Sequence, residues 1–356
     1  MDRTRDASKR AAQLTVPDDK INEVQMILDA ILPNLAMFIR PLRLVSSGWT
    51  GHVPFGAWLT AVQQPRVLVE LGSHFGMSYA AFCQTVQNEG LNTKCYAVDT
   101  WQGDEHAGFY GDSVYNDLAA FNDKHFSGFS RLMRMTFDEA TTYFEDGSVD
   151  LLHIDGLHTY EAVKHDFESW LPKLSDRAIV LFHDTNVRER DFGVWQYWAE
   201  ITKQYPGFEF DHSAGLGVLA VGPNQPAEVR KLLDLPKDQV GAKAVKEVFS
   251  SLGESTLRRW ELESTRQELA SKASDVERVL AQLATVDKEL STLQKDHLRA
   301  AGLLEQYDRT VKETHARNEA LSGELARSEA ARGAVENSLS WRITKPLRAA
   351  RRMFKG

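Results

Sequence analysis

The stretch Arg66-Val-Leu-Val-Glu-Leu-Gly-Ser-His-Phe-Gly-Met-Ser78 organises this chain. Its first part, Val67 to Leu71, is short, apolar and rich in β-branched residues, which is typical of a buried parallel strand. Gly72 and Gly76 then form a tight turn, and a helix is predicted from Met77. In open α/β sheets ligands bind where strands end and loops lead into helices, and glycines there let the backbone approach a ligand.

The glycine spacing of this turn is Glu70-x-Gly72-x-x-x-Gly76, which differs from the Gly-x-Gly-x-x-Gly of pyrophosphate-binding turns. A carboxylate near the end of the strand suits a cationic or hydroxylated ligand better than a phosphate. We therefore expect a ligand site of that kind at this turn. The alternative is a strand–helix turn whose glycines serve only packing.

Strands and helices alternate along the chain after this turn. Strands are expected at 66–71, 94–99, 130–135, 149–155 and 177–183, and helices at 77–88, 113–125, 137–145, 159–171 and 192–204. A hairpin of 207–212 and 216–221 closes the series. This alternation predicts an α/β fold: a Rossmann-like, doubly wound, mostly parallel seven-stranded sheet with an antiparallel C-terminal hairpin, followed by a long α-helical coiled coil.

The bulk composition limits the possible functions. The chain has 356 residues and a net charge of −8, which argues against nucleic-acid binding. Its two cysteines, Cys83 and Cys95, lack metal-ligand spacing and are expected in the core of a protein from a reducing compartment. We find neither a signal-peptide pattern nor a run of 18 apolar residues, so a cytoplasmic protein is expected.

We divide the chain into five parts. Residues 1–44 form an N-terminal helical segment, with a helix from Asp18 that Pro33 bends, and residues 45–222 form the α/β domain. Within 42–60, a turn-rich loop with Trp49 and His52 is expected to be either a lid over the ligand or a plain surface loop. Residues 223–256 are interpreted as a linker, 257–339 as a coiled coil, and 340–356 as a basic amphipathic tail.

The coiled-coil prediction rests on a heptad pattern. One heptad position carries Leu262, Leu269, Val276, Leu283, Leu290, Leu304, Val311 and Leu325, interrupted by His297 and Asn318. Such a pattern over about nine heptads favours a homo-oligomer, and a buried Asn such as Asn318 often fixes its register and strand number. A single long helix, or a helical hairpin packed on the domain, is the alternative.

The C-terminal tail is strongly basic. Residues 337–356 contain six Lys or Arg and no acidic residue. Thr344 and Pro346 are placed to begin a short helix, which would gather Ile343 and Leu347 on one side. Basic amphipathic ends of this kind bind anionic membrane surfaces, which would make the protein peripheral at the inner face of the cell membrane. A solvated tail, or one docked on an acidic partner, is the alternative.

Acidic residues recur at the ends of predicted strands. Glu70, Asp99, Asp155 and Asp184 all lie at such ends, which meet at one edge of a parallel sheet. Their mutual repulsion is costly unless a cation lies between them. Asp99, at the end of the second strand, has the position of an acid that binds ribose hydroxyls, unless it only caps a helix.

Two further residues near these strand ends are candidates for contacts with a base. Trp101 follows Asp99 closely and is a candidate to cover a base. Asp138, after the next strand, is a weaker candidate for the adenine edge.

Two short segments, Asp155-Gly-Leu-His158 and His183-Asp184, predict a metal site. Neighbouring parallel strands lie about 4.8 Å apart, so Asp155 and Asp184 can share one Mg²⁺, which favours carboxylates and water. Such a metal lowers the pKa of a bound hydroxyl, and His158 is placed to take the proton. Alternatively, His158 caps a helix and His183 is a core residue.

At these residues the chain resembles class I S-adenosylmethionine-dependent methyltransferases. The matching pieces are Val69-Glu-Leu-Gly-Ser-His-Phe-Gly76, Ala97-Val-Asp-Thr-Trp101, His153-Ile-Asp-Gly-Leu-His158 and Leu181-Phe-His-Asp-Thr185. The pair Asp-Gly-x-His and His-Asp is similar to the metal-dependent sugar O-methyltransferases of macrolide tailoring, of methyltransferase family 24 type, with a broader relation to catechol-type O-methyltransferases.

This resemblance implies roles for single residues. The implied cofactor-binding set is Glu70, Gly72, Ser73, Gly76, Ser78, Asp99, Trp101, Asp138 and Asp155. Within it, Glu70 would lie near the amino group of the methionine part and Asp99 would hold the ribose. Asp155 and Asp184 would hold Mg²⁺, and the catalytic residues would be His158, as the base, and Asp155. Catechol-type enzymes have Asp-Asn where this chain has Asp184-Thr185, and Asn186 comes one residue late.

The overall layout also resembles O-antigen chain-capping proteins, in which a methyltransferase precedes a coiled coil and a membrane-binding end. The tail from Ser338 to Arg348 is similar to ends of bacterial surface-polysaccharide enzymes. These resemblances imply an O-methyltransferase that acts on a sugar or glycan hydroxyl. Two alternatives are a membrane-tethered coiled-coil scaffold with an inactive head that binds the cofactor, and a methyltransferase of small-molecule hydroxyls. An oxygenase ranks last because no 2-His-1-carboxylate spacing is present.

Overall fold

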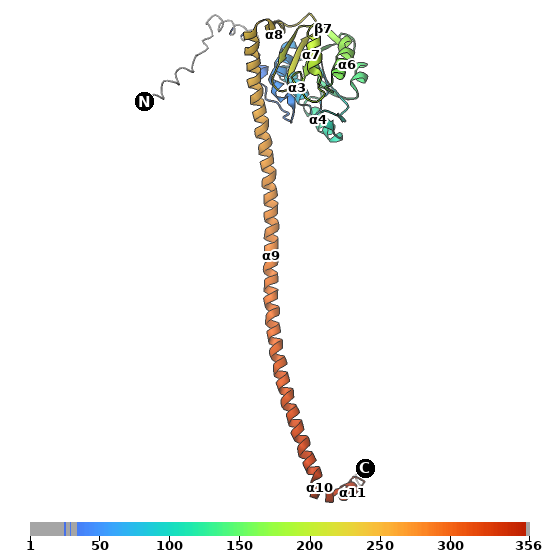
Figure 1. Cartoon of the computed structure of the whole chain (residues 1–356), viewed down its shortest axis with the longest axis vertical. Helices are drawn as coiled ribbons and strands as arrows, with labels where there is room; N and C mark the ends of the chain where they lie inside the picture. The colour runs from blue at the N-terminus through green and yellow to red at the C-terminus, as the bar shows by residue number, and fades with distance from the viewer. Residues whose placement is uncertain (1–24, 26–28, 30–33, 354–356) are drawn as a thin grey trace, which may run out of the picture. The chain divides into compact units, whose positions relative to one another are not determined.

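The computed structural model describes residues 34–353, together with residues 25 and 29. The part of the helix predicted from Asp18 that precedes residue 34 therefore lies outside the described residues, apart from these two positions. The chain divides into two units, the first ending at Arg266 and the second beginning at Gln267. Figure 1 shows the first as a layered α/β domain and the second as helices.

A seven-stranded sheet forms the centre of the first unit. Its strands lie in the order β5-β2-β1-β6-β7-β9-β8. Their bounds are β1 Val67–Leu71, β2 Lys94–Asp99, β5 Ser130–Arg134, β6 Val149–Ile154, β7 Leu174–His183, β8 Gly207–Phe210 and β9 Leu216–Ala220. Neighbours pair in parallel except for β9, which is antiparallel to β7 and β8. This confirms the predicted mostly parallel sheet with an antiparallel closing hairpin.

The strand register brings the predicted acidic ends to one edge. Leu71, the last residue of β1, pairs with Val98 of β2 and with Ile154 of β6. Ile154 pairs in turn with Phe182 of β7. The next strands in the chain, β2 and β5, lie on one side of β1, and the later strands β6 and β7 lie on the other. The crevice at β1 and β6 is therefore the switch point where ligands bind in such sheets.

Helices cover both faces of the sheet, and two separate apolar clusters form the core. One cluster includes side chains from α2 Val53–Gln63, α3 Met77–Asn88, α4 Asp112–His125, α8 Ala227–Asp234 and the start of α9 Gln239–Asn337. The other includes α5 Phe137–Thr141, α6 Tyr160–Trp170 and α7 Val194–Ile201. Strand residues alternate between them, as Leu68 and Val69 of β1 do.

The remaining elements are short. Single 3₁₀ turns are η1 Leu35–Phe38, η2 Gly48–His52, η3 Leu171–Lys173 and η4 Leu235–Lys237. A two-stranded ribbon joins β3 Gly103–Asp104 and β4 Gly108–Phe109. Both cysteines are buried in the core, as predicted.

The segment before β1 is folded into the domain, which corrects the prediction of a lid or surface loop. Trp49 is 1% exposed and His52 is fully buried, both within η2. The helix α2 follows directly, with Pro54 in its first turn. Its Gly56 lies under the ring of Trp49, where a Cβ would collide with the indole. The segment is therefore a packed wall of the domain.

The segment predicted as a linker, 223–256, is also part of the first unit. It forms α8, η4 and the first turns of α9, and Val245 and Phe249 are fully buried. Phe249 packs edge-on against Phe55 and Phe210, with ring centroids 5.3 and 5.7 Å apart. The first unit therefore extends to Arg266 instead of ending at residue 222.

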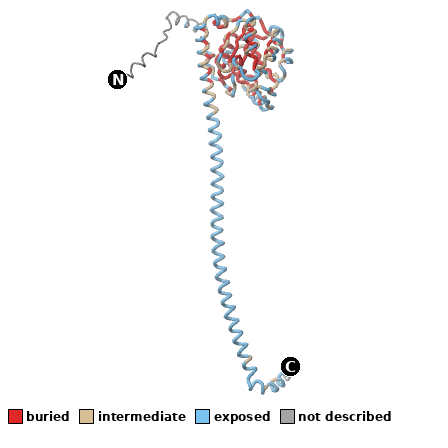
Figure 2. Tube along the Cα trace, in the orientation of Figure 1, coloured by how far each residue is buried: buried red, intermediate tan, exposed pale blue. Residues whose placement is uncertain are grey.

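Helix α9 continues without a break to Asn337, which confirms the prediction of a long C-terminal helix. Figure 2 shows that the part of α9 in the second unit is exposed along its length. Its apolar heptad residues are between 46% and 69% exposed. Oligomerisation through this face stays a prediction.

The chain ends in two short helices, α10 Leu339–Ile343 and α11 Lys345–Met353. Ser338 caps α10, and Pro346 lies in the first turn of α11 as expected. Arg348 lies over the ring of Trp341 at 3.5 Å from its centroid. Ile343 and Leu347 are each 71% exposed. Among the described helices, none combines the length and apolar character needed to cross a bilayer.

Candidate functional site

The turn after β1 brings the backbone close to two neighbouring elements. Gly72 and Gly76 have φ values of +86° and +73°, which side chains other than glycine rarely adopt. A Cβ at Gly72 would collide with the carbonyl oxygen of Asp155, and one at Gly76 with Leu118. The packing interpretation of these glycines is therefore correct in part, but both also line a cavity.

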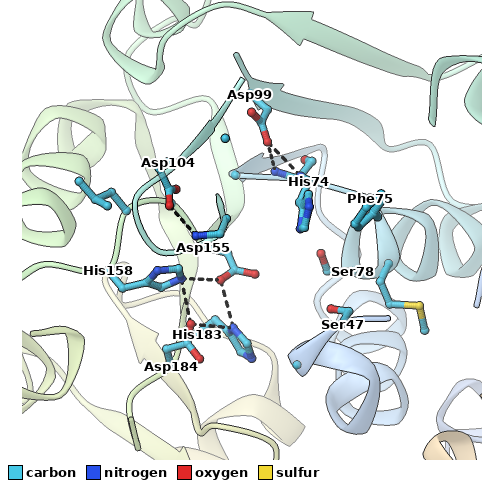
Figure 3. A pocket seen from close by; sticks show the side chains of 18 of the residues that line it. Ser47, His74, Phe75, Ser78, Asp99, Asp104, Asp155, His158, His183 and Asp184 are labelled. Carbon is cyan, nitrogen blue, oxygen red and sulfur yellow. Dashed lines mark hydrogen bonds and ion pairs between the residues drawn. The ribbon is translucent and has the colours of Figure 1, made fainter. Parts of the chain in front are cut away.

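This cavity has a volume of about 850 Å³ and lies at the carboxyl ends of β1, β2, β6 and β7. Most predicted site residues line it: Gly72, Ser73, Gly76, Ser78, Asp99, Asp155, His158 and Asp184. Figure 3 shows the side chains of Ser78, Asp99, Asp155, His158 and Asp184, which come from separate elements. Ligand pockets are commonly roughly 300–1,000 Å³, so this cavity has the size of a substrate or cofactor site.

Asp99 binds the glycine turn directly. One carboxylate oxygen accepts hydrogen bonds from the backbone N–H groups of Ser73 and His74, each at 2.9 Å. The other oxygen accepts the N–H of Trp101 at 2.6 Å. Asp99 therefore holds the turn in shape while its carboxylate faces the cavity (Figure 3).

A second group of side chains contains the residues that were predicted to hold a metal ion. Asp155, His158 and Asp184 each offer a ligand atom, and these atoms lie within 4.8 Å of one another. Nε2 of His158 is 2.9 Å from Asp184 and 3.6 Å from Asp155. Asp184 has a φ of +61°, an uncommon backbone for a residue with a side chain. Such conformations cluster at functional sites.

His183 closes this cluster from the buried side. Its Nδ1 lies 3.0 Å from Asp155 and 3.4 Å from Asp184, and the side chain is 6% exposed. Burial alone would lower the pKa of His183, but the two carboxylates raise it well above its usual value. His183 is therefore a partner of the acidic pair and not a plain core residue.

The charges of the cluster shift one another's pKa values. Burial alone would raise the pKa values of Asp155 and Asp184, but the imidazoles of His183 and His158 hold both below their usual range. Burial alone would lower the pKa of His158, but its bonds to both carboxylates raise it to about 9. The cluster thus favours bound positive charge, whether carried by protons or by a metal ion.

An aromatic ring fixes the plane of the His158 imidazole. Phe192 stacks on it with ring centroids 4.7 Å apart and an interplanar angle of 7°. His106 packs against both rings, with its centroid 4.5 Å from that of Phe192 and 5.5 Å from that of His158, and its Nε2 is 2.5 Å from Asp191. This stack restricts His158 to one orientation towards the carboxylates.

Three predicted cofactor residues do not line the cavity. Glu70 is fully buried, and its carboxylate lies 2.9 Å from Nδ1 of His153. Trp101 is also fully buried, and its Nε1 donates to the carbonyl of His74. Asp138 is exposed and bonds to His165 on α6. These three positions correct the prediction of direct contact with a ligand.

The position of Glu70 has a simple cause. It is the fourth of five residues in β1, so its side chain still follows the alternation of the strand. It points to the same side as Leu68, where His153 and Trp49 lie with ring centroids 5.5 Å apart. Only residues beyond the strand ends are free to turn into the cavity.

Asn186 is directed away from the cluster. Its amide donates to the backbone carbonyl of Asp211, and Thr185 before it is fully buried. The third side chain beside the acidic pair is therefore His158.

Several cavity residues were missed by sequence reasoning. His74 has a φ of +46° and stacks on Tyr110 at 4.8 Å, and both line the cavity. Arg190, and Leu257 and Trp260 of α9, line it too. His74 lies within the turn that was singled out, so its position was readable. No local pattern marks Trp260, because α9 reaches the cavity only through long-range packing.

Comparisons with known proteins give one family match and several similar proteins. Residues 69–185 match a family model described as a methyltransferase domain. The Uncharacterized protein y4gI of Sinorhizobium fredii (strain NBRC 101917 / NGR234) is 45% identical over 253 residues, which are 71% of this chain and 28% of that protein. The chain therefore spans little more than a quarter of this relative.

Among solved structures, the chain is similar to the O-methyltransferase TomG from Streptomyces achromogenes in complex with SAM. The identity is 14%, the TM-score is 0.37, and 60% of this chain and 95% of that one are covered. It is likewise similar to an O-methyltransferase from Bacillus cereus in complex with SAH. There the identity is 13%, the TM-score is 0.37, and the coverage is 60% and 96%. The first unit has a Rossmann-like fold, and residues 69–185 within it match the methyltransferase domain model.

Proposed function

We propose that this chain, with its Rossmann-like fold and its match to a methyltransferase domain, is an S-adenosylmethionine-dependent O-methyltransferase assisted by Mg²⁺. Its acceptor would be a sugar hydroxyl, methylated in the synthesis of a surface glycan. One observation carries the proposal: a single cavity is lined by the glycine turn of β1, by Asp99 and by the cluster of Asp155, His158 and Asp184. A donor and an acceptor hydroxyl can meet there.

The donor would lie along the turn from Gly72 to Ser78. Asp99 keeps that turn in place and retains an acceptor position for a ribose hydroxyl. His74 and Tyr110 form a stacked pair beside it. A bound S-adenosylmethionine supplies a methyl group on a sulfonium, which is already electrophilic. The protein then needs mainly to align the acceptor oxygen with that methyl and to remove its proton.

The acidic pair fits a hard divalent cation. Mg²⁺ is usually held by one or two carboxylates together with waters and substrate oxygens, and Asp155 and Asp184 offer the carboxylates. A cation held there would lower the pKa of a substrate hydroxyl. Without a cation, the two carboxylates raise the pKa of His158 to about 9. The positive charge of a bound cation would oppose this effect and lower the pKa of His158.

In this proposal His158 would accept the proton. Its Nε2 faces the acidic pair where the hydroxyl would lie, and Phe192 holds the ring in that orientation. A neutral imidazole at this place acts as a general base.

The second unit supports two further proposals. Its exposed apolar heptad face would be covered in a homo-oligomeric coiled coil, and Asn318 would set the number of strands. Sedimentation equilibrium of the full chain and of Asn318→Leu tests this. A monomeric full chain would overturn the coiled-coil proposal. An Asn318→Leu variant with the same oligomeric state as wild type would overturn the role of Asn318.

The basic tail, with Ile343 and Leu347 exposed, would bind an anionic membrane surface. Flotation with phosphatidylglycerol vesicles, and with phosphatidylcholine vesicles as the control, tests this. Such a location suits an enzyme of surface-glycan synthesis.

The long exposed helix also favours a second candidate function, a scaffold whose head binds the donor without turnover.

The experiment for the enzymatic proposal is transfer of a labelled methyl group from S-adenosylmethionine to methyl glycosides. Wild type, Asp184→Ala and a control, Asp123→Ala on the exposed side of α4, are compared with Mg²⁺ and with EDTA. With Mg²⁺ present, we expect wild type and the Asp123→Ala control to transfer the methyl group. We expect no transfer in the presence of EDTA, and none by Asp184→Ala. Transfer that survives both treatments removes the metal from the mechanism, and donor binding without any transfer favours the scaffold.

A further inference from the structure

One wall of the cavity comes from outside the sheet and its loops. Leu257 and Trp260, both on α9, line the cavity together with Ser46, Ser47 and Gly48. The two side chains are three residues apart on a helix, so they lie on the same face, and both are half-buried. The cavity therefore has an apolar wall made by the first turns of α9.

Close backbone packing fixes this wall in place. Gly253 of α9 lies against Gly51 of η2, where a Cβ would collide with the carbonyl oxygen of Gly51. Thr256, on the same face, is 8% exposed, and Phe249, one turn before Gly253, is fully buried. Trp260 lies about two turns beyond the contact, so its backbone position is set by the core.

Trp260 differs from three other aromatic residues of the cavity, which pack on its histidines. Tyr110 and Phe75 pack on His74, and Phe192 packs on His158. Within residues 34–353, by contrast, the indole of Trp260 makes neither a ring contact nor a hydrogen bond through Nε1. A flat apolar ring with a free N–H donor is thus available to whatever enters the cavity.

We propose that Trp260 and Leu257 form the acceptor subsite, with the indole stacked on the C–H face of a sugar ring. This inference rests on the proposed function and names the residues that select its acceptor class. A pyranose combines an apolar C–H face with a rim of hydroxyls, and tryptophan offers a large apolar surface with one polar handle. Glu189 and Arg190, which also line the cavity, supply an acceptor and donors for the hydroxyl rim.

The size and composition of the cavity agree with two ligands. The glycine turn and Asp99 account for its donor side, and the α9 wall belongs to neither this turn nor the acidic cluster. A volume of about 850 Å³ is near the upper end of the range for one drug-sized ligand. Space therefore remains for a sugar beside the donor.

The test measures binding of methyl glycosides to the full chain loaded with S-adenosylhomocysteine and Mg²⁺, so that no turnover is needed. Saturation-transfer difference NMR reports the dissociation constant and the sugar protons in contact. The variants are Trp260→Ala, Trp260→Phe and Leu257→Gln. Glu261→Ala, the exposed next residue on α9, is the matched control. Melting curves and titration of S-adenosylhomocysteine verify folding and donor binding in each.

We expect the glycoside dissociation constant to rise about tenfold in Trp260→Ala, and less in Trp260→Phe, which keeps a ring. Leu257→Gln should weaken binding without abolishing it. Glu261→Ala should behave as wild type, and the affinity for S-adenosylhomocysteine should be unchanged throughout. If Trp260→Ala fails to fold, Trp260→Phe and Leu257→Gln decide the matter.

Three results overturn the inference: no glycoside binding by wild type, equal binding by Trp260→Ala and wild type, or a Trp260-dependent signal only with a catechol such as 3,4-dihydroxybenzoate. Trp260-dependent glycoside binding without methyl transfer leaves the subsite standing and overturns the proposed function alone.

Discussion

Gly253 of α9 and Gly51 of η2 touch through their backbones, and no side chain fits between them. The contact joins the first turns of α9 to the 3₁₀ turn that begins at Gly48, and Gly48 itself lines the cavity. One and two turns beyond Gly253, the side chains of Leu257 and Trp260 reach the same cavity. A pair of glycines thus determines where one wall of the site stands.

Gly253→Ala is predicted to destabilise the first unit by about 1–3 kcal/mol, because the added methyl group forces the two backbones apart. Helix propensity alone predicts the opposite, a gain of up to about 1 kcal/mol. Gly302→Ala and Gly323→Ala are the controls, since a Cβ there meets nothing within 4 Å and both lie off the apolar heptad face. Urea unfolding followed by tryptophan fluorescence measures the first unit, and thermal loss of the far-UV dichroism follows the helix. A Gly253→Ala protein as stable as wild type contradicts the packing.

Asp99→Asn is predicted to weaken S-adenosylhomocysteine binding roughly 10- to 100-fold. The amide keeps one acceptor oxygen for the N–H groups of Ser73 and His74, but its NH₂ then faces the N–H of Trp101. A charge-assisted bond is worth about 1.5–3 kcal/mol, so its loss loosens the turn that the donor lies along. Isothermal titration of Asp99→Asn against Asp123→Asn checks this, and equal affinities would disprove the role of Asp99.

Asp166→Asn is predicted to stabilise the protein more at high pH than at low pH. Burial raises the pKa of Asp166 to about 7, with Asp138 adding to the shift and His165 opposing it. Because the folded pKa exceeds the unfolded value, the wild-type carboxyl lowers stability progressively as pH rises from about 4 to about 7. Asparagine resembles the protonated acid and removes this penalty.

The gain in unfolding free energy from Asp166→Asn should therefore be about 2 kcal/mol larger at pH 8.5 than at pH 5.5, since each pKa unit corresponds to about 1.36 kcal/mol. Urea titrations at the two pH values measure it. The prediction fails if the gain is the same at both.

The sequence predicted the sheet well because its strands are short apolar runs bounded by clear turns. The residues immediately after those strands, Gly72, Asp155 and Asp184, lie in the cavity as expected. Glu70 does not, because a residue one position before the end of a strand still alternates into the core. A shift of one residue thus separates a site carboxylate from a buried one.

The parts that the sequence did not predict depend on burial from all sides or on distant contacts. Helix α2 is apolar around its circumference and contains Pro54 and Gly56, so it has no amphipathic period and resembles a loop. The first turns of α9 precede the heptads, and their packing face is revealed only by partners such as Phe55. The position of Trp260 at the cavity likewise depends on contacts between residues far apart in the sequence.

The central claim is that one pocket holds a sulfonium donor and a cation bound by Asp155 and Asp184. The most direct measurement is the NMR linewidth of the methyl signal of [methyl-¹³C]S-adenosylmethionine bound to the protein, with Mn²⁺ in place of Mg²⁺. Paramagnetic relaxation falls with the sixth power of distance, so only a donor methyl close to the ion is broadened. The account predicts strong broadening of the methyl signal in wild type. The broadening should disappear when EDTA is added, and it should be absent in the double variant Asp155→Asn/Asp184→Asn. A bound donor whose methyl signal stays sharp with Mn²⁺ present, or is broadened equally in the double variant, would contradict it.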